Sequence, residues 1–424
     1  MRSDLAHSLR SQSADEECEV LVVGAGPHAL TCCSYLLRRQ PALRERLVVV
    51  DPDGWLTRWN RQFDALDIDR LRSHAIDHPD PEPYALWESA QGPDTDMGPY
   101  TTPGVRLFAD FCRTIIGRYG LDEVRRHDRV ERIVYSGRGV WATLAGGDRL
   151  LAKRVVLATN TRVPRIPRWA RHLATQAPPG HILHTEELDL RGVRLDGERI
   201  MVVGGGLTAG QIALTALTRG ATVTLVSRSR LRTQVFDVQG GWLTPAHLCG
   251  FYAEPSAHRR VELIEAARRG SMTPAVFCTL EQETGSGTVS VRGDCEVRSA
   301  SWDGSCWQVD LDQHTEQVHR IWLATGTAPR LDTESLLAQV IATQPTEVAG
   351  GLPVLDSACR WPGTEIHLMG GSAALQLGPA ARNLVGARMA AERIAHCVRP
   401  LDRYQYVQPA APRSPAFIST VTCA

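Results

Sequence analysis

Two glycine-rich runs carry the residue types and the spacing that let a backbone approach a phosphate group. The first run is Gly24-Ala25-Gly26-Pro27-His28-Ala29, and the second is Gly204-Gly205-Gly206-Leu207-Thr208-Ala209. In such runs the first glycine permits a tight turn, the second lets backbone N–H groups reach a pyrophosphate, and the final small residue lets a helix pack on a strand. Each run therefore predicts a turn that binds a dinucleotide.

Apolar residues place each run between a strand and a helix. Residues 20–23 are Val-Leu-Val-Val ahead of the first turn, and residues 200–203 are Ile-Met-Val-Val ahead of the second. A helix that begins at the turn offers unpaired N–H groups and its positive dipole end to the phosphates. The chain is therefore expected to hold two nucleotides, although an ordinary tight connection is the alternative for either turn taken alone.

The residue that ends the next strand distinguishes the two nucleotides. The apolar run 47–50 ends in Asp51, where a carboxylate accepts hydrogen bonds from ribose hydroxyls, which favours an adenosine without a 2′-phosphate, as in FAD. The run 221–226 ends instead in Ser227, followed by Arg228 and Arg230. Arginine forks suit a 2′-phosphate, which predicts NADPH, and a solvated pair of charges at a strand end is the alternative.

An internal repeat pairs the two halves of the chain. Trp141 begins an alternating segment that leads to Ala158, and Trp307 begins one that leads to Ala324, with the same spacing of 17 residues. Each half thus carries a glycine turn, a helix, hairpin strands and a closing strand. We expect an α/β fold of two Rossmann-like dinucleotide-binding domains, with an NADPH domain inserted into an FAD domain as in glutathione reductase.

Composition shifts and prolines predict the domain limits. The expected segments are a disordered N-terminus (1–16), a discontinuous FAD domain (17–167 and 352–400), an NADPH domain (182–326) and a flexible tail (401–424). Inside the NADPH domain, residues 235–274 form an aromatic and charged insertion. It is interpreted equally well as a substrate lid and as a subdomain that stabilises the fold.

Composition narrows the classes of partner. The chain has 424 residues, 43% of them hydrophobic, and its 47 basic and 47 acidic residues give no net charge, which argues against binding to nucleic acid or to an anionic membrane. No apolar run approaches the roughly 20 residues of a membrane span, so a cytoplasmic location is expected. Eleven scattered cysteines without a CxxC motif predict reduced thiols and no metal site, and a homo-oligomer is left open.

Four further stretches carry a resemblance to a known family. They are the loop with Trp55, Trp59 and Asn60, the segment from Arg72 to Tyr84, residues 180–185 with His184, and the run that begins Leu377-Gly378. With the glycine turns, these stretches resemble the class B flavoprotein monooxygenases over most of residues 17–400. The likeness is greatest to the branch that N-hydroxylates lysine and ornithine.

The resemblance implies roles for individual residues. Trp59, Asn60 and His184 are expected near the chemistry, with core packing as the alternative for the tryptophan loop and a satisfied surface or capping role as the alternative for the histidine. The remaining implied cofactor contacts are Trp55, Arg72, Gly326, Leu377 and Gly378. The helix after Gly378 is expected to aim its N-terminus at the flavin, unless it is an ordinary interdomain helix.

The resemblance also implies an activity. In this family NADPH reduces FAD, O2 then gives a C4a-hydroperoxyflavin, and a nucleophilic heteroatom of a small molecule is oxygenated, which the resemblance here implies to be an amine nitrogen. S-oxygenation or Baeyer-Villiger chemistry, an NADPH:acceptor reductase without oxygen insertion, and a non-catalytic redox sensor are the alternatives. Ile76 stands where the lysine- and ornithine-acting members have a lysine before the aspartate that matches Asp77. A free diamino acid bound in that mode is therefore not expected.

Overall fold

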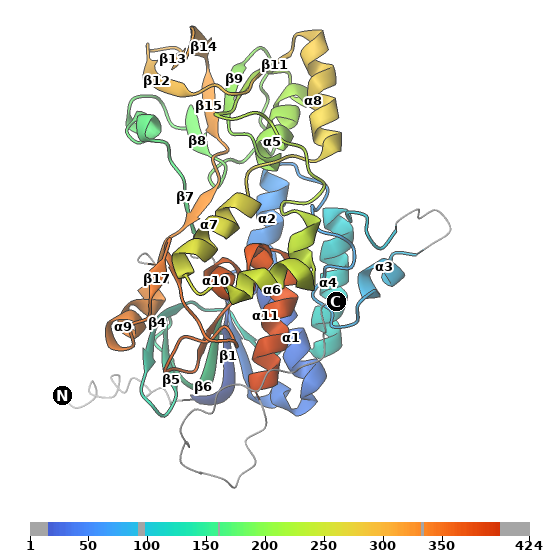
Figure 1. Cartoon of the computed structure of the whole chain (residues 1–424), viewed down its shortest axis with the longest axis vertical. Helices are drawn as coiled ribbons and strands as arrows, with labels where there is room; N and C mark the ends of the chain where they lie inside the picture. The colour runs from blue at the N-terminus through green and yellow to red at the C-terminus, as the bar shows by residue number, and fades with distance from the viewer. Residues whose placement is uncertain (1–15, 92–97, 160–161, 332–334, 399–424) are drawn as a thin grey trace, which may run out of the picture.

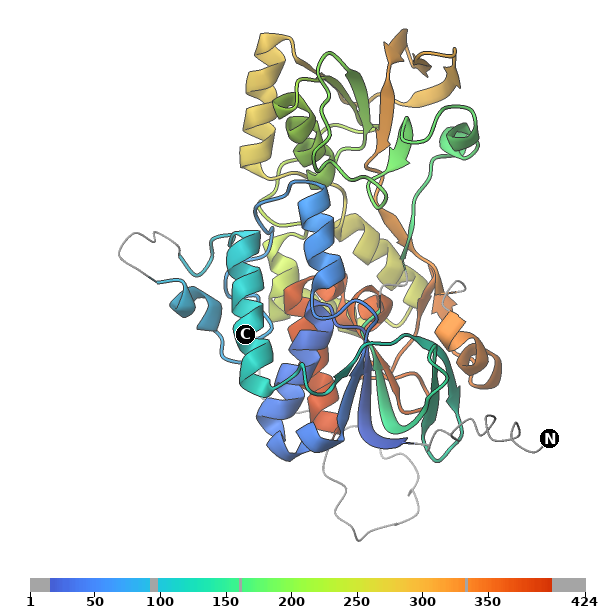
Figure 2. The same ribbon diagram turned by 180° about the vertical axis from the view of Figure 1, so that it is seen from behind.

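The computed structural model describes residues 16–91, 98–159, 162–331 and 335–398. A mixed sheet and a parallel sheet lie one above the other along the long axis of the molecule, each with helices on one face (Figure 1, Figure 2). The disordered segment expected at 1–16 lies outside the described residues except for Glu16, and so does the tail expected at 401–424. This arrangement confirms the predicted α/β fold with two Rossmann-like units.

The lower sheet is built around buried valine-rich strands. Its strand order is β3-β2-β1-β6-β5-β4, and β19 pairs with the last residues of β6, on the edge that faces away from β1. Strands buried on both faces read as continuous apolar runs, which is how residues 47–50 appear in the sequence. Helices α1 and α11 pack side by side on one face. The strands are β1 (Glu16–Val23), β2 (Leu47–Val50), β3 (Arg125–Arg126), β4 (Val130–Tyr135), β5 (Val140–Leu144), β6 (Arg149–Leu157) and β19 (Ile366–Leu368).

The upper sheet repeats this order with its own helices. Its strands run β11-β10-β9-β15-β8, and all their pairings are parallel. Helices α5 and α8 cover one face, and a three-stranded meander, β12-β13-β14, packs Trp307 against Met201 on the other. The strands are β8 (Ile182–His184), β9 (Arg199–Val203), β10 (Thr222–Val226), β11 (Val289–Arg292), β12 (Val297–Trp302), β13 (Trp307–Leu311), β14 (Thr315–Val318) and β15 (Arg320–Leu323).

A two-stranded ribbon and the insertion connect the sheets. Strands β7 and β16 pair antiparallel between the two halves, and helices α6 and α7 of the insertion lie near the centre of the molecule (Figure 1). Helix α7 packs against α10 and the 3-10 turn η8, which belong to the lower half. These elements are β7 (Arg162–Pro164), β16 (Thr327–Pro329), α6 (Pro245–Ala253), α7 (Ala257–Ala267), α10 (Ala374–Leu377) and η8 (Pro379–Arg382).

The remaining helices complete the two cores. In the lower half they are α1 (Pro27–Arg39), α2 (Thr57–Ala65), α3 (Ala85–Ser89), α4 (Val105–Tyr119), α9 (Ala338–Thr343) and α11 (Leu384–Cys397), and in the upper half α5 (Leu207–Thr218) and α8 (Pro274–Ser286). A short hairpin, β17 (Val348–Ala349) with β18 (Leu352–Pro353), follows α9. Among the described residues, none of the helices has the length and apolar character that a membrane span requires.

Candidate cofactor and substrate site

The first glycine turn leaves open space where a phosphate could approach. Gly24 has a φ of +102°, and a side-chain carbon there would lie 3.0 Å from the carbonyl oxygen of Ala158, so only glycine fits without strain. A side-chain carbon on Gly26, in contrast, would meet nothing within 4 Å. Helix α1 begins directly after it with Pro27 at its first position, so its free N–H groups face this space.

Asp51 is held in place by the backbone around this turn. Its Oδ2 accepts a hydrogen bond from the N–H of Ala25 at 2.9 Å, and its Oδ1 accepts from those of Asp53 and Gly54 at 2.8 Å. Leu56 adopts a left-handed φ of 58° and donates its N–H to the carbonyl of Ala25 at 2.8 Å. The carboxylate is therefore oriented beside the turn, and its contact with a ribose stays a prediction.

The second turn has the same design with tighter packing. A side-chain carbon on Gly204 would lie 2.3 Å from the carbonyl oxygen of Ala324, and one on Gly205 would lie 2.4 Å from Oγ of Ser227. Gly206 again has open space, and α5 begins at the next residue with the sequence Leu207-Thr208. The residues present therefore fit a second pyrophosphate at this turn.

Two arginines lie free at the end of the second strand of this unit. The side chains of Arg228 and Arg230 are exposed and make no hydrogen bond or ion pair with the described residues, while the hydroxyl of Ser227 donates to the carbonyl of Ser229 at 2.7 Å. The backbone N–H of Arg230 donates to Asp294 at 2.9 Å, which fixes the loop. A 2′-phosphate contact is compatible with this geometry and stays a prediction.

The tryptophan loop supplies packing and one orphaned acceptor. Trp59 packs on Phe63 and Phe108, with ring centroids 4.4 Å and 5.2 Å apart, and Trp55 donates its indole N–H to the carbonyl of Leu121 at 3.4 Å. The described contacts of both rings are therefore those of a core. Oδ1 of Asn60 is buried without a donor among the described residues, as is expected beside a ligand that supplies one.

His184 is the last residue of β8, the edge strand of the upper sheet that follows the crossover between the halves. Its side chain is buried, with the residue 2% exposed. Nε2 donates to the carbonyl of Gly326 at 3.1 Å, and Nδ1 accepts from the N–H of Glu186 at 3.2 Å. These partners require the neutral imidazole, and burial accordingly lowers the pKa of His184. Both ring nitrogens are occupied, so the contacts seen are structural, and the catalytic role stays a prediction.

Arg72 connects the segment after α2 to the insertion. Its guanidinium donates to the carbonyls of Gln234 and Ser271 at 2.9 Å, and to those of Val235 and Phe236 at 3.3 Å and 3.1 Å. It also donates to the hydroxyl of Ser271 at 2.8 Å. These bonds fix the insertion onto the lower half, and the predicted contact of Arg72 with a cofactor is not among them.

The turn after α10 approaches the first glycine turn. Leu377 is fully buried, and Gly378 has a φ of +84° beside Leu248 of the insertion. Further along, Nε2 of His28, in the first turn of α1, donates to the carbonyl of Ala381 at 3.3 Å. The turn η8 and the N-terminus of α11 are therefore brought next to the space in front of Gly26.

Sequence reasoning missed Arg125, which follows the short connection after α4. Nε and Nη1 of this residue are buried without a partner among the described residues, and its guanidinium carbon would lie 3.6 Å from a side chain on Gly54. A half-buried arginine with two unused donors beside the Asp51 loop is a candidate contact for the adenosine end of a nucleotide. No local sequence signal marks it, because its position depends on the pairing of β3 with β2.

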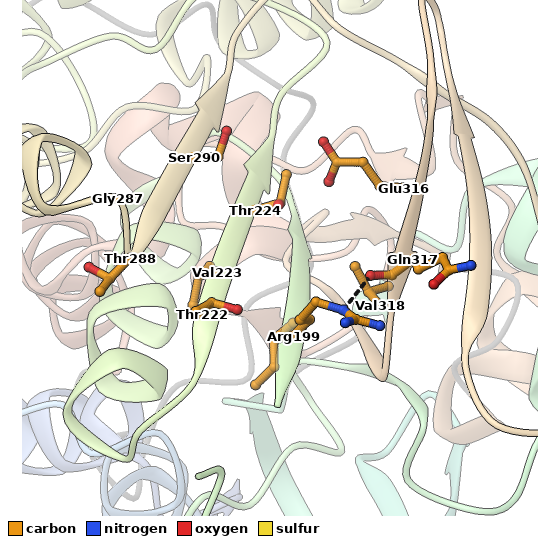
Figure 3. Close-up of a pocket in the computed structure, with 11 residues that line it drawn as sticks. Arg199, Thr222, Val223, Thr224, Gly287, Thr288, Ser290, Glu316, Gln317 and Val318 are labelled. Atoms are coloured by element: carbon orange, nitrogen blue, oxygen red, sulfur yellow. Dashed lines mark hydrogen bonds between the residues drawn. The ribbon is translucent and has the colours of Figure 1, made fainter. Parts of the chain in front are cut away.

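The groove shown in Figure 3 lies at the opposite end of the upper sheet. It encloses about 370 Å³, and Arg199 and Thr222, the first residues of β9 and β10, line it with Glu316 and Gln317 of β14. Nε of Arg199 donates to the carbonyl of Gln317 at 2.9 Å across it. Because the glycine turn follows the last residue of β9, this groove is separate from the nucleotide site.

Comparison with known families agrees with this geometry. A family model described as L-lysine 6-monooxygenase/L-ornithine 5-monooxygenase matches residues 118–328, and one described as FAD-NAD(P)-binding matches residues 21–162. Over residues 118–328, just under half of its length, the chain is therefore similar to the N-hydroxylating branch of the flavin monooxygenases. No curated protein sequence matches it.

Solved structures share the fold at low sequence identity. The ornithine hydroxylase of Pseudomonas aeruginosa is 17% identical with a TM-score of 0.69, over 90% of this chain and 98% of that one. The L-lysine 6-monooxygenase of Pseudomonas syringae is 19% identical with a TM-score of 0.71, over 90% and 99%. A bacillithiol disulfide reductase of Bacillus cereus is 16% identical with a TM-score of 0.57, also over 90% and 99%. These three structures share the fold of both halves of this chain.

Proposed function

We propose that this chain is an FAD- and NADPH-dependent monooxygenase that oxygenates a nucleophilic heteroatom of a small molecule, and in particular an amine nitrogen. The observation that carries the proposal is the pair of glycine turns, each with open space in front of its middle glycine, in one chain that is similar to the N-hydroxylating branch. A single nucleotide site would not need the second turn.

Each cofactor has a set of residues that fits it. Gly26, Asp51 and the first turn of α1 would hold FAD, and Gly206 with Arg228 and Arg230 would hold NADPH. When bound, FAD takes two electrons from NADPH and activates O2, one atom of which enters the substrate while the other leaves as water.

The chain's own residues supply enclosure and orientation. Arg72 fixes residues 234–236 onto the lower half, and α7 packs on η8, so the insertion covers the turn that approaches Gly26. His184 fixes the crossover by its two backbone bonds. These contacts favour the lid interpretation of the insertion, because a covered site excludes water and protects a reactive oxygen species.

The test measures NADPH consumption and hydrogen peroxide release across a panel of amines, thiols and ketones, with protein reconstituted in FAD. A true substrate raises NADPH consumption and suppresses peroxide release, and amines are expected to do so. Protein that stays colourless after FAD addition contradicts the proposal. So does NADPH oxidation that is no faster in air than without oxygen.

Electron transfer to an acceptor without oxygen insertion is the second candidate, because the fold is shared with a disulfide reductase. The two adjacent cysteines of α1 are not suited to act as a redox dithiol. Cys32 and Cys33 are fully buried in α1, and burial raises the pKa of Cys32 to about 12, so neither is a ready thiolate. Acceptor reduction by NADPH under anaerobic conditions, with no oxygenated product in air, would favour this candidate.

A further inference from the structure

The segment between α2 and α3 holds an imidazole and a carboxylate side by side. Nδ1 of His74 lies 3.5 Å from Oδ2 of Asp77, and the backbone N–H of Asp77 donates to the carbonyl of His74 at 3.0 Å, which closes a tight turn. Among the described residues, neither side chain has another hydrogen bond or ion pair, and 15% of the His74 side chain is exposed. Nε2 of His74 therefore has no partner in this part of the chain.

Backbone hydrogen bonds fix this turn against the stretch before α4. Ala75 donates its N–H to the carbonyl of Thr101 at 2.9 Å, and Ile76 donates its N–H to the carbonyl of Pro99 at 3.2 Å. Side chains that stand on such a fixed backbone keep their geometry without help from a ligand. The imidazole and the carboxylate are therefore ordered as a pair.

The ring of His74 contacts two aromatic rings from other segments. Its centroid lies 3.7 Å from that of Phe236 in the insertion and 5.8 Å from that of Tyr100. Tyr100 and Val235, the neighbour of Phe236, are two of the four large apolar side chains that are exposed among the described residues. Exposed apolar groups gathered in one place mark a surface that contacts a ligand or a partner.

The insertion connects this ring to the turn that approaches Gly26. Asp237, directly after Phe236, forms an ion pair with Arg268 and accepts a hydrogen bond from Nδ2 of Asn383 at 2.7 Å. Asn383 lies between η8 and α11, the two elements that reach the space in front of Gly26. The pair therefore stands beside the proposed flavin site, on the side covered by the insertion.

The charged groups of the packed segments have partners of their own. Arg72 donates to oxygens of residues 234–236 and 271, and Asp237 is held by Arg268 and Asn383. Nε2 of the buried His78 donates to a carbonyl of its own segment at 3.2 Å. Asp77 is thus the carboxylate that serves His74.

A carboxylate beside one ring nitrogen prepares the other nitrogen to take a proton. It keeps the proton of the neutral imidazole on Nδ1, and it stabilises the imidazolium that forms when Nε2 is protonated. An alkylamine supplies such a proton, because it is an ammonium ion at pH 7. Its nitrogen has no free electron pair to take up oxygen until one N–H bond breaks.

We propose that His74, oriented by Asp77, is the base that deprotonates the ammonium group of an alkylamine substrate. This inference rests on the proposed function and names a catalytic residue and a substrate class for the same site. The proton moves to Nε2 of His74, the electron pair of the broken bond stays on the nitrogen, and the imidazolium later releases the proton to solvent. The exposed Tyr100 and Val235 suit the apolar part of such an amine.

The test uses FAD-reconstituted protein and primary alkylamines, beginning with n-hexylamine, and it measures oxygenated amine and hydrogen peroxide. His74→Gln is expected to lower kcat/KM for the amine about a hundred- to ten-thousand-fold at pH 7, the usual contribution of a general base. The deficit should shrink as the pH rises to 9, because the neutral fraction of the free amine grows roughly a hundred-fold over that range. FAD retention and NADPH oxidation without amine should stay unchanged.

Two further variants complete the comparison. Asp77→Asn should show the same kind of pH-dependent loss, and because this change keeps the shape of the side chain, it carries the test if His74→Gln does not retain FAD. His258→Gln is the matched control and should oxygenate the amine as the parent does. His258 is an exposed histidine of α7 in the insertion, without a hydrogen bond or ion pair to the described residues.

Three results would overturn the inference. His74→Gln could oxygenate the amine as the parent does at pH 7, or both variants could lose the same factor at every pH, which would assign the pair to packing against Phe236. The parent could also oxygenate thiols or ketones and no alkylamine, which would leave a monooxygenase without this base. Failure of the proposed function looks different, since that protein would not retain FAD or would not consume oxygen.

Discussion

The two glycine turns repeat one backbone design and differ in the side chains placed around it. In the lower sheet the N–H of Gly24 donates to the carbonyl of Val50 at 2.9 Å, and in the upper sheet the N–H of Gly204 donates to that of Val226 at 2.8 Å. The residue after the second strand differs, being Asp51 in one and Ser227 in the other. The fold thus duplicates a phosphate holder, and a few side chains decide which nucleotide it suits.

The duplicated turns also differ in how closely the next strand approaches. The backbone oxygen that faces the first glycine lies farther from that glycine in the lower turn. A side-chain carbon added to Gly24 would lie 3.0 Å from this oxygen, and one added to Gly204 would lie 2.3 Å from its counterpart. The strands that contain Trp141 and Trp307 also pair differently in the two halves. The first hairpin, β4-β5, extends the lower sheet, whereas β12-β13-β14 forms a sheet of its own.

The largest expected effect comes from blocking one turn at a time. Gly26→Glu should abolish FAD retention, because a carboxylate would occupy the open space and repel the pyrophosphate. Gly206→Glu should leave the protein yellow and abolish NADPH binding instead. The absorbance spectrum after desalting and NADPH titration measure the two losses. Yellow colour retained by Gly26→Glu would place FAD elsewhere.

Two glycines of the upper turn, the crowded Gly204 and Gly206 with open space beside it, should differ in how substitution changes stability. Gly204→Ala should lower the free energy of unfolding by on the order of 3 kcal/mol, because the added carbon meets a backbone oxygen. Gly206→Ala, with nothing within 4 Å, should change it little. Denaturant unfolding of the two variants checks this contrast, and equal losses would contradict the packing described here.

Removing the arginines after β10 should affect one coenzyme. Replacing Arg228 and Arg230 by alanine should weaken NADPH binding about ten- to a hundred-fold, since a charge-assisted contact contributes roughly 1.5 to 3 kcal/mol. NADH lacks the 2′-phosphate and should bind as before. Dissociation constants for both coenzymes measure the difference, and equal losses would remove the proposed contact.

Arg125 tests the opposite turn with a smaller expected effect. Arg125→Met should weaken FAD binding about ten-fold without lowering the unfolding temperature of the apoprotein, because the buried donors have no partner to lose. FAD titration and thermal unfolding of the apoprotein give both values. A destabilised apoprotein with unchanged FAD affinity would make Arg125 a packing residue.

The loss of stability at acidic pH is expected to come more from the first glycine turn than from the second. His28 occupies the position that Thr208 has in the second turn, and burial lowers the pKa of His28 below its usual 6.5. The unfolded chain then binds a proton before the folded chain does, so the stability from this residue is present above about pH 6.5 and is lost as the pH falls. His28→Thr should flatten the decline of unfolding temperature between pH 7 and 5. An unchanged slope would assign the decline to other buried histidines.

The strand, turn and helix at residues 20–29 and 200–209 were accessible from sequence, because local spacing dictates them. The ion pair of Arg268 with Asp237 and the bond of Arg268 to Asn383 were not, since these residues are distant in sequence and meet where α7 packs on η8. The bonds of His184 and Arg72 likewise depend on tertiary pairing. The domain limits and the chemical roles of the site residues stay predictions.

Strands β7 and β16 pair with each other, so the chain enters and leaves the upper sheet side by side. A two-stranded ribbon flexes across its plane more readily than within it, so swings of the upper half relative to the lower are channelled into a single hinge direction. Arg162 of β7 bonds to Thr327 on the opposite strand, so the two strands are joined by side chains as well as by their backbones. Any change in the distance between the two glycine turns would therefore move both strands of the ribbon together.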